Sequence, residues 1–458
     1  MMEEKLDKEL CFVIAKYLKS KFPNLATSFI KECEANKLFP SSIFSENPTF
    51  DQLEKSLKGI PNEQLLELVC FACPSSSKNQ SLLFSIPKPN QALKLGDNIE
   101  YQIPDFKNCI TEFRPVIRNV GHYKPIYCLA FDNTSQIVIT GSDDYVIKVW
   151  SLKEYSLMKT YFIHKNVITD ISIDPTNNYF ASSSHDFTIG FFSLINGTLI
   201  KKLKFTCEIH MIKFSPCGKY LAAACQNGFV QVYKVDDIIN NKNPKPFIKI
   251  ETQTKESAAW LDFSPGSEFI AFSADPNSLS IYSFSKNCMI SLEGHTNLPE
   301  FLSFSKKSCK YLISLSSKEK QIRIWKAAES KWETEIILTG KNLQSNINAK
   351  FLKCFWNCDE SRIVAISSHA IYVWETNKYE LLLTISHELY TNQCSTLSVN
   401  PKNPKYVFVS CVSGVSAIWN IFTGKLVKIL QENEFTKITE SRWSPDGQSI
   451  VAADAAAG

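Results

Sequence analysis

The sequence has no segment that predicts insertion into a membrane. Its apolar runs are all shorter than the roughly 20 residues that a membrane-spanning helix requires. The first residues, MMEEKLDKEL, contain no apolar core of the kind found in secretion signals. We therefore expect a soluble protein that has no membrane partner.

The sequence also lacks a marked excess of charge of either sign. Lysine and arginine total 50, and aspartate and glutamate total 46, which leaves a formal net charge of +4 at pH 7. Binding to nucleic acid relies on clustered positive charge. Because the excess here is small and dispersed, we expect no direct nucleic acid partner.

Cysteine motifs with the spacing of a metal site are missing. The 15 cysteines are spread along the chain. Without a secretion signal, this distribution predicts a reducing compartment and free thiols. Cys70 and Cys73 form a C-x-x-C motif, but no second Cys or His pair follows at zinc-finger spacing. We therefore predict no metal and no cofactor.

What the sequence does contain is a repeated pattern, shown most completely between Gly121 and Trp150. This stretch reads GHYKPIYCLAFDNTSQIVITGSDDYVIKVW. A Gly-His pair precedes an apolar segment that ends at Phe131, a turn leads into a second apolar segment, and a third ends at Trp150. The pattern predicts three short strands. It resembles a WD repeat, which forms one four-stranded blade of a β-propeller.

The pattern recurs along the chain at intervals of 41 to 52 residues, against roughly 40 to 45 per blade for this repeat class. The predicted first strands end at Phe131, Ile173, Phe214, Phe263, Phe304, Trp356, Val399 and Trp443. The aromatic residues of the predicted third strands are Trp150, Phe192, Tyr233, Tyr282, Trp325, Trp374 and Trp419.

The predicted fold follows from the number of strands. Eight first strands are predicted, but only seven of them are followed by a third-strand aromatic residue. We expect a mainly β protein, a WD-repeat β-propeller of eight blades whose last blade is incomplete, with residues 113–120 as the outer strand of that blade. The alternative is a seven-bladed propeller in which the residues after about 432 form a partial addition. An incomplete blade leaves a strand edge unpaired, so we also expect the chain to be a fragment of a longer protein.

Residues 1–73 predict an N-terminal α-helical domain, because apolar residues recur there at helical spacing. Residues 74–112 are polar and punctuated by proline, as in a linker. The propeller is predicted over residues 113–458. The order of five residues in the first helices resembles a LisH motif, which implies a homodimer. These residues are Ile14, Tyr17, Leu18, Ala26 and Phe29. An ordinary helical cap packed on the propeller is the alternative.

Histidine, aspartate, hydroxyl and tryptophan residues recur at fixed places in the repeats. The resemblance to WD repeats implies a hydrogen-bonded tetrad that joins neighbouring strands. In blade one its members are His122, Asp144, Trp150 and either Thr140 or Ser142. In blade two the predicted members are Ser184 and Asp186.

The tetrad residues are the types found in a hydrolase triad, but their recurrence at blade period favours a structural role. No G-x-S-x-G motif or phosphate-binding loop accompanies them. Asn227-Gly228 in blade three and Glu319 in blade five occupy the place of the aspartate, which we interpret as decay of the tetrad. We predict that the protein is not an enzyme.

Loops from several blades converge on each face of a propeller, so the loops that carry the Gly-His pairs are candidates for partner binding. The candidate residues are Tyr123, Lys124, Asp143, Tyr145, Lys165, Glu208 and Tyr390. An insertion between Asp236 and Lys255 is expected to form a solvated hairpin extension.

The helical segment sharpens the family resemblance. The strings ELCFVIAKYL, ANKLFP and NEQLLELVC precede the first repeats in the order seen in the bromodomain and WD-repeat family, which the chain resembles over most of residues 6–235. This resemblance implies a scaffold that takes part in chromatin-linked transcription regulation or acts as a substrate receptor of a cullin-4 ubiquitin ligase. The implied partners are a cullin-4 ligase adaptor, histones or transcription regulators, in the nucleus and secondarily in the cytoplasm. A reader of histone tails through the propeller face is the alternative.

The chain departs from this family in two respects. No bromodomain is present in the 458 residues. The W-D-x-R signature associated with the ligase adaptor is also missing, because the third-strand aromatics are followed by other residues. These residues are Ser151, Lys326, Glu375 and Asn420.

Overall fold

The computed structural model describes the repeat region of the chain. The described residues are Ile30, 121–226, 228–251, 260–275, 278–307, 310–328, 331–339, 350–387, 393–430 and 437–454. The predicted helical domain, the linker and the predicted closing strand at 113–120 lie outside these residues, as do the predicted dimerisation residues from Ile14 to Phe29.

Seven sheets of four antiparallel strands form the blades of a propeller, and the strands of each sheet pair in sequence order. Blades one and two contain β1 (Ile126–Phe131), β2 (Ile137–Ser142), β3 (Ile147–Ser151), β4 (Ser156–Tyr161), β5 (Ile168–Ile173), β6 (Tyr179–Ser184), β7 (Thr188–Ser193) and β8 (Thr198–Lys204). Blades three and four contain β9 (Ile209–Phe214), β10 (Tyr220–Cys225), β11 (Phe229–Lys234), β12 (Ile248–Glu251), β13 (Trp260–Phe263), β14 (Phe269–Asp275), β15 (Ser278–Ser283) and β16 (Cys288–Glu293).

Blades five to seven complete the set of four-stranded sheets. They contain β17 (Phe301–Phe304), β18 (Tyr311–Ser316), β19 (Gln321–Ala327), β20 (Trp332–Thr339), β21 (Phe351–Trp356), β22 (Arg362–Ser367), β23 (Ile371–Glu375), β24 (Leu381–Ile385), β25 (Cys394–Val399), β26 (Tyr406–Cys411), β27 (Ser416–Asn420) and β28 (Lys425–Leu430). The predicted ends of the first strands, from Phe131 to Trp443, are confirmed in every repeat, and each predicted third-strand aromatic lies in a third strand.

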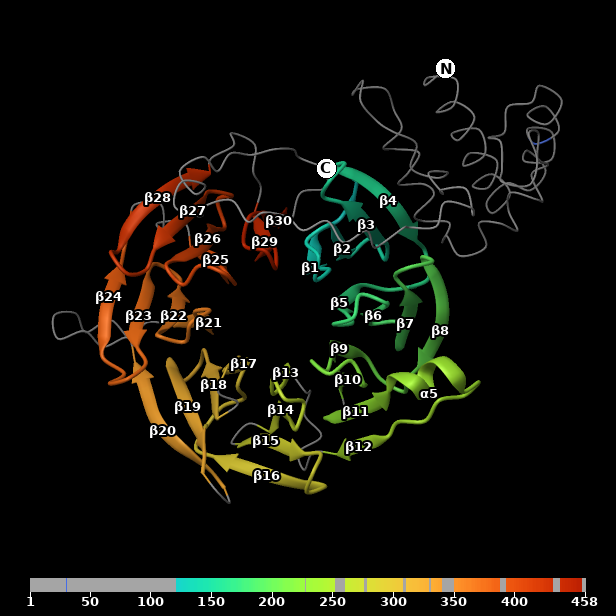
Figure 1. Ribbon diagram of the computed structural model, residues 1–458, viewed down its shortest axis with the longest axis horizontal. Helices are drawn as coiled ribbons and strands as arrows, with labels where there is room; N and C mark the ends of the chain where they lie inside the picture. Colours follow the sequence, from blue (N-terminus) through green and yellow to red (C-terminus); the bar gives the residue numbers. More distant parts are fainter. Residues whose placement is uncertain are drawn as a thin grey trace.

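A two-stranded sheet, β29 (Ile438–Trp443) and β30 (Ile450–Asp454), lies in the ring between the seventh blade and the first (Figure 1). The backbone N–H of Trp443 donates to the hydroxyl of Ser398 in β25, 3.0 Å away. On the other side, the hydroxyl of Thr439 donates to the backbone carbonyl of Ile126 in β1. The seven complete blades agree with the number in the alternative prediction, whereas the position of β29 and β30 is the one predicted for an incomplete eighth blade.

The blades pack face to face, and this packing explains the sequence pattern. β2 and β7 are buried at every position because each sheet is covered on both faces by its neighbours. One hydrophobic cluster combines Ile139 and Val149 of blade one with Ile171 and Phe180 of blade two. The first strands and the outer strands are partly exposed, as β5 and β4 are. The core is therefore a series of interfaces between blades.

The predicted hairpin extension between Asp236 and Lys255 is wrong. The segment begins with a short helix, α5 (Val235–Asn240), and continues into β12, the outer strand of blade three. Val235 and Ile238 are three residues apart and both buried, while Asp236 and Asp237 occupy the first turn, where negative charge is favourable. In the part of the chain that the structure describes, no helix is long and apolar enough to cross a membrane.

Candidate functional site

The tetrad of blade one is a continuous chain of hydrogen bonds. His122 Nδ1 lies 2.7 Å from the Asp144 carboxylate, and His122 Nε2 lies 2.8 Å from the Thr140 hydroxyl. The indole N–H of Trp150 donates to the same hydroxyl over 2.9 Å. Nδ1 therefore carries the proton that the carboxylate accepts, and Nε2 accepts from Thr140. The four side chains connect the loop before β1 with β2, β3 and the turn between them.

The two hydroxyls proposed for this tetrad have different roles. Thr140 completes the tetrad, whereas Ser142 donates to the backbone carbonyl of Lys124 over 2.9 Å and accepts from the backbone N–H of Asp144 over 3.1 Å. Ser142 thus fixes the turn that presents Asp144. Gly121 precedes His122 in the chain. A larger residue would clash at this position, because a Cβ atom there would lie 2.6 Å from the Trp150 ring.

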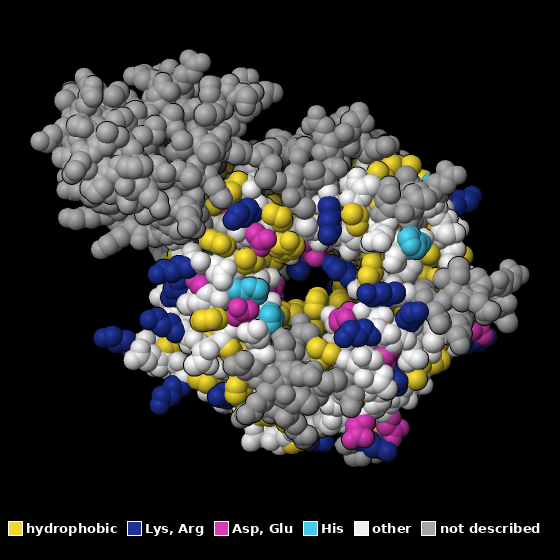
Figure 2. All heavy atoms as spheres, turned by 180° about the vertical axis from the view of Figure 1, so that it is seen from behind, with side chains coloured by type: hydrophobic (Ala, Val, Ile, Leu, Met, Phe, Trp, Pro, Cys, Tyr) yellow, Lys and Arg dark blue, Asp and Glu magenta, His cyan; other side chains and the backbone are white. Residues whose placement is uncertain are grey.

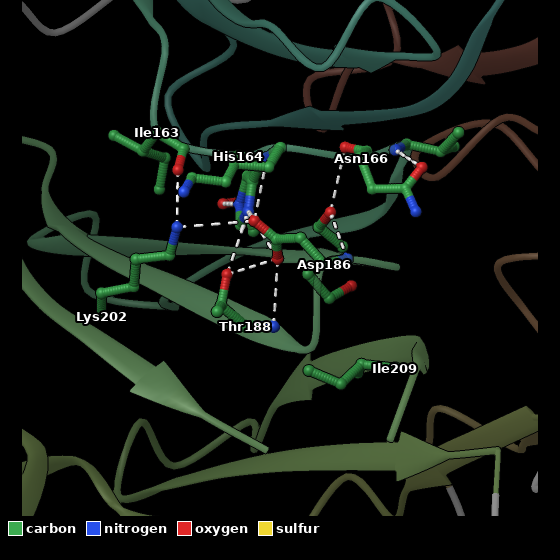
Figure 3. Close-up of polar contacts among 12 residues, drawn as sticks. Ile163, His164, Asn166, Asp186, Thr188, Lys202 and Ile209 are labelled. Atoms are coloured by element: carbon green, nitrogen blue, oxygen red, sulfur yellow. Dashed lines mark hydrogen bonds and ion pairs between the residues drawn. The ribbon is translucent and has the colours of Figure 1, made fainter. Parts of the chain in front are cut away.

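Blade two repeats the arrangement with a different hydroxyl and without the tryptophan (Figure 3). His164 Nε2 lies 2.8 Å from the hydroxyl of Ser182, and His164 Nδ1 lies 3.2 Å from the Asp186 carboxylate. The predicted member Ser184 instead donates to the backbone carbonyl of Asn166 over 3.0 Å. It is the counterpart of Ser142, because both serines end the second strand of their blade.

The Asp186 carboxylate has several donors besides His164. The hydroxyl of Thr188 and the backbone N–H of Lys165 both donate to its carboxylate, and the Lys202 ammonium lies 3.4 Å away. Burial alone raises the pKa of Asp186, but the hydrogen bonds from His164, Thr188 and the Lys165 N–H outweigh it and hold the pKa well below its usual range.

Blade five contains a complete tetrad that the sequence interpretation missed. His295 contacts the Glu319 carboxylate at 3.1 Å and the Ser314 hydroxyl at 2.7 Å. The indole N–H of Trp325 donates to Ser314 over 2.8 Å. The predicted decay of the tetrad at Glu319 is therefore wrong, because the longer side chain reaches the same histidine. The signal was available in the sequence, since Gly294-His295 and Trp325 are both present.

The three histidines are inaccessible to a substrate. His122 is 5% exposed, His164 is 1% exposed and His295 is 2% exposed. Burial lowers the pKa of each one and outweighs the opposing attraction of its carboxylate partner. At pH 7 they are neutral hydrogen-bonding groups between strands. Such an arrangement supports the fold, because a general base has to reach the proton that it removes.

The predicted partner-binding residues of blade one are partly exposed and lie near its tetrad. The Lys124 ammonium lies 5.4 Å from the centre of the Tyr145 ring. The Tyr123 hydroxyl donates to the backbone carbonyl of Asp144 over 3.3 Å. Tyr123, Lys124 and Tyr145 thus form one group around the turn between β2 and β3. Lys165 is exposed in blade two, and Tyr390 lies outside the described residues.

A row of polar side chains continues from this group into blades two and three. Burial raises the pKa of Asp143, and the nearby charges of Lys124 and His185 oppose the effect. His185 Nε2 lies 3.9 Å from the Glu208 carboxylate, and its ring meets the His210 ring edge-on at 5.7 Å. Figure 2 shows histidine and acidic side chains beside the central opening of this face. The sequence interpretation selected Asp143 and Glu208 but missed the two histidines between them.

Charged side chains of the first strands also pair with one another. Lys213 in β9 pairs with Asp262 in β13, and Lys353 in β21 lies 2.8 Å from Glu440 in β29. Each pair links the first strands of two different blades. Among the described residues, no group of three or more His, Cys, Asp or Glu side chains is arranged to hold a metal ion.

Comparison with known proteins agrees with the repeat pattern. The family model "WD domain, G-beta repeat" matches residues 108–151, 155–193 and 197–234. The solved structure of a computationally designed protein, Ika8, matches with a TM-score of 0.60 at 18% identity, over 73% of this chain and 95% of that one. The β-propeller domain of Myceliophteria thermophila Cps50 (Swd1) matches with a TM-score of 0.52 at 13% identity, over 67% and 98%. The chain therefore contains WD40 repeats that fold as a β-propeller.

The chain is distantly related to other WD-repeat proteins. A bromodomain and WD repeat-containing protein of Dictyostelium discoideum is 23% identical over 80% of this chain and 20% of its own length. A p21-activated protein kinase-interacting protein 1-like protein of Danio rerio is 28% identical over 53% of this chain and 63% of its own length. This chain thus spans a fifth of the first relative and less than two thirds of the second.

Proposed function

We propose that this chain is a non-enzymatic scaffold that binds protein partners on the face carrying the loops before the first strands, since WD40 propellers generally act as scaffolds for protein interaction. The proposal rests on the difference between the buried and the partly exposed polar side chains at this face. The tetrad histidines are buried and join strands, while Lys124 and Asp143 of blade one and Glu208, which precedes the first strand of blade three, remain partly exposed.

We further propose that the scaffold works in chromatin-linked transcription regulation or as a substrate receptor of a cullin-4 ubiquitin ligase. The distant relative with bromodomains supports this assignment. The protein would then act in the nucleus, and secondarily in the cytoplasm, and its partners would be histones, transcription regulators or the ligase adaptor. Residues 1–73 would add a homodimer contact through the LisH-like helices.

Proximity labelling of the full chain tests the choice of face. Changing Tyr123, Lys124 and Tyr145 together to alanine should remove a defined set of labelled neighbours. The matched control changes Lys219, Lys402 and Gln448 to alanine, because these exposed residues lie in or beside the turns at the opposite ends of the blades. Equal labelling by both triple variants would show that the chosen face is wrong.

A reader of histone tails is the second candidate function. It is favoured by the partly exposed carboxylates of Asp143 and Glu208, since histone tails are basic. Binding of the full chain to an array of histone peptides tests this role. Loss of the signal in an Asp143→Asn, Glu208→Gln variant is expected, and silence across the array would count against it.

We also propose that β29 and β30 are half of an eighth blade whose outer strand is residues 113–120. Replacing 113–120 by a Gly-Ser stretch of equal length should lower the melting temperature. The same replacement at residues 81–88, in the predicted linker, should not. Equal melting temperatures for the two variants would favour the seven-bladed alternative.

A further inference from the structure

The turn between the second and third strands takes the same unusual backbone conformation in five blades. One residue of each turn has a positive φ angle, in the left-handed region. These residues are Tyr145 (68°), Phe187 (65°), Gly228 (73°), Lys320 (57°) and Gly414 (84°). Glycine enters this region without a steric penalty, whereas a bulky side chain does not. Blades three and seven therefore use the residue that the turn favours, and blades one and two use aromatic residues.

Burial of the two aromatic rings does not offset this strain. Phe187 is 45% exposed, and Tyr145 is partly exposed. Neither ring belongs to the hydrophobic clusters formed by the described residues of blades one to three. The Lys124 ammonium over the Tyr145 ring is a surface contact. Strained backbone of this kind clusters at active sites, ligand clamps and switch regions.

The surroundings of the two turns indicate what the ligand carries. Tyr127, in the strand that enters blade one from the same face, is 51% exposed and adds a third ring. Asp143 lies two residues before Tyr145 in the sequence. His185 lies two residues before Phe187, and its ring faces the Glu208 carboxylate. Burial lowers the pKa of His210, so its ring is uncharged at neutral pH. Hydrophobic side chains gather with acidic ones beside the opening in Figure 2.

We infer that Tyr145 and Phe187 are docking residues for a polypeptide segment in which basic side chains alternate with apolar ones. The apolar side chains pack on the two rings, and the basic ones face the carboxylates of Asp143 and Glu208. Aromatic faces attract cations as well, so both parts of the surface select the same partner. The inference rests on the proposed scaffold function and names the class of partner and the residues that bind it.

The experiment measures binding of the full chain to short synthetic peptides by fluorescence anisotropy. One peptide carries lysine between leucines, and the other carries glutamate in place of lysine. The wild-type chain should prefer the basic peptide. The double variant Tyr145→Gly, Phe187→Gly should bind it at least about tenfold more weakly, a factor that corresponds to about 1.4 kcal/mol.

The matched control is Lys320→Gly, which makes the same change in the corresponding turn of blade five. Both variants should keep the wild-type melting temperature or exceed it, because glycine relieves the strained turn. A second double variant with asparagine at both positions, which also tolerates this conformation, separates loss of the rings from added flexibility. It should bind as weakly as the glycine variant.

Two results would overturn the inference. One is equal binding of the basic and acidic peptides by the wild-type chain, including no binding of either. The other is basic-peptide binding by the double variant that matches that of Lys320→Gly. If either occurs while the Tyr123, Lys124 and Tyr145 triple variant still loses its labelled neighbours, the peptide assignment fails and the scaffold proposal stands.

Discussion

Blades one and two hold the same histidine–carboxylate–hydroxyl chain among side chains of different sizes. Blade one has Gly121 before the histidine and the large Trp150 ring over it, whereas blade two has Ile163 before the histidine and the smaller Phe192. Gly190 of blade two makes room for this isoleucine, since a Cβ atom there would lie 2.4 Å from the Ile163 side chain. A blade thus keeps its packing by changing several positions together.

The difference extends to the hydrogen bonds. Trp150 adds a donor to the hydroxyl of its tetrad, and Phe192 has none to add. Blade two instead has Thr188 and Lys202 on its carboxylate. The comparison teaches that the conserved element between these two blades is the His–carboxylate–hydroxyl chain, while the aromatic position serves packing first.

The largest expected effect comes from removing the carboxylate of blade one. Asp144→Ala leaves the buried His122 Nδ1–H without its acceptor and should lower the free energy of unfolding by about 3 kcal/mol. Asp186→Ala should cost less, because its carboxylate is nearer to solvent. Urea denaturation of both variants measures the difference, and an equal loss would remove this distinction between the blades.

The next largest effect concerns the size of the aromatic residue in blade two. Phe192→Trp overpacks the site, because Phe192 already stacks on Phe180 with ring centres 4.4 Å apart. A loss of about 2 kcal/mol is expected. Adding Ile163→Gly, which copies blade one, should recover part of it. Thermal unfolding of the single and double variants checks the idea, and a double variant less stable than the single one would contradict it.

Acid should destabilise the propeller through its tetrad histidines. Their folded pKa values lie below the ordinary 6.5, so the unfolded chain binds more protons between the two values and stability falls as pH drops below 6.5. Each histidine that stays neutral contributes a loss of about 0.8 kcal/mol at pH 6.

The measurement compares urea denaturation at pH 8 and pH 6. Asp170 acts in the opposite direction as the pH falls through about 6, because burial raises its pKa to about 6 and protonation of the buried carboxyl stabilises the folded state. His122→Gln and His164→Gln should each reduce the loss of unfolding free energy between pH 8 and pH 6 by about 0.8 kcal/mol, the contribution of one histidine. A flat profile in the wild-type chain would contradict the assigned neutral state.

Removing the indole donor of blade one should have a smaller effect on stability. Trp150→Phe converts its aromatic position to that of blade two and deletes the hydrogen bond to Thr140. The expected loss is about 1 kcal/mol, since Thr140 keeps His122 as a partner. Chemical denaturation measures it, with Trp150→Leu as the variant that also loses the ring and should lose more.

The smallest expected effect is that of the partly exposed ammonium in blade two. Lys202→Met removes the contact with Asp186, and surface pairs contribute about 0.5 kcal/mol or less. Raising the salt concentration should produce a similar change in the wild-type chain. A loss of stability as large as that of Asp186→Ala would mean that Lys202, rather than His164, is the more important partner of the Asp186 carboxylate.

Much of the ring was predictable from local signals. The strand ends from Phe131 to Trp443 follow from apolar segments that stop at turn residues, and these signals lie within a few positions of each other. The helix α5 was missed because a six-residue helix has too few apolar positions to show its period. Glu319 was missed because the interpretation required an aspartate, although a longer side chain reaches the same histidine.

The sequence by itself determined the period of the repeats, the order of the strands and the positions that carry the tetrads, because alternation and turn chemistry are local. Only the tertiary structure decided that Thr140 and Ser182, rather than Ser142 and Ser184, donate their hydroxyl hydrogens to the histidines, and that His185 lies 3.9 Å from the Glu208 carboxylate. Those outcomes depend on how neighbouring strands and sheets pack. The residues that meet there are separated by a strand or a whole blade of sequence, and spacing alone does not say which side chains face one another.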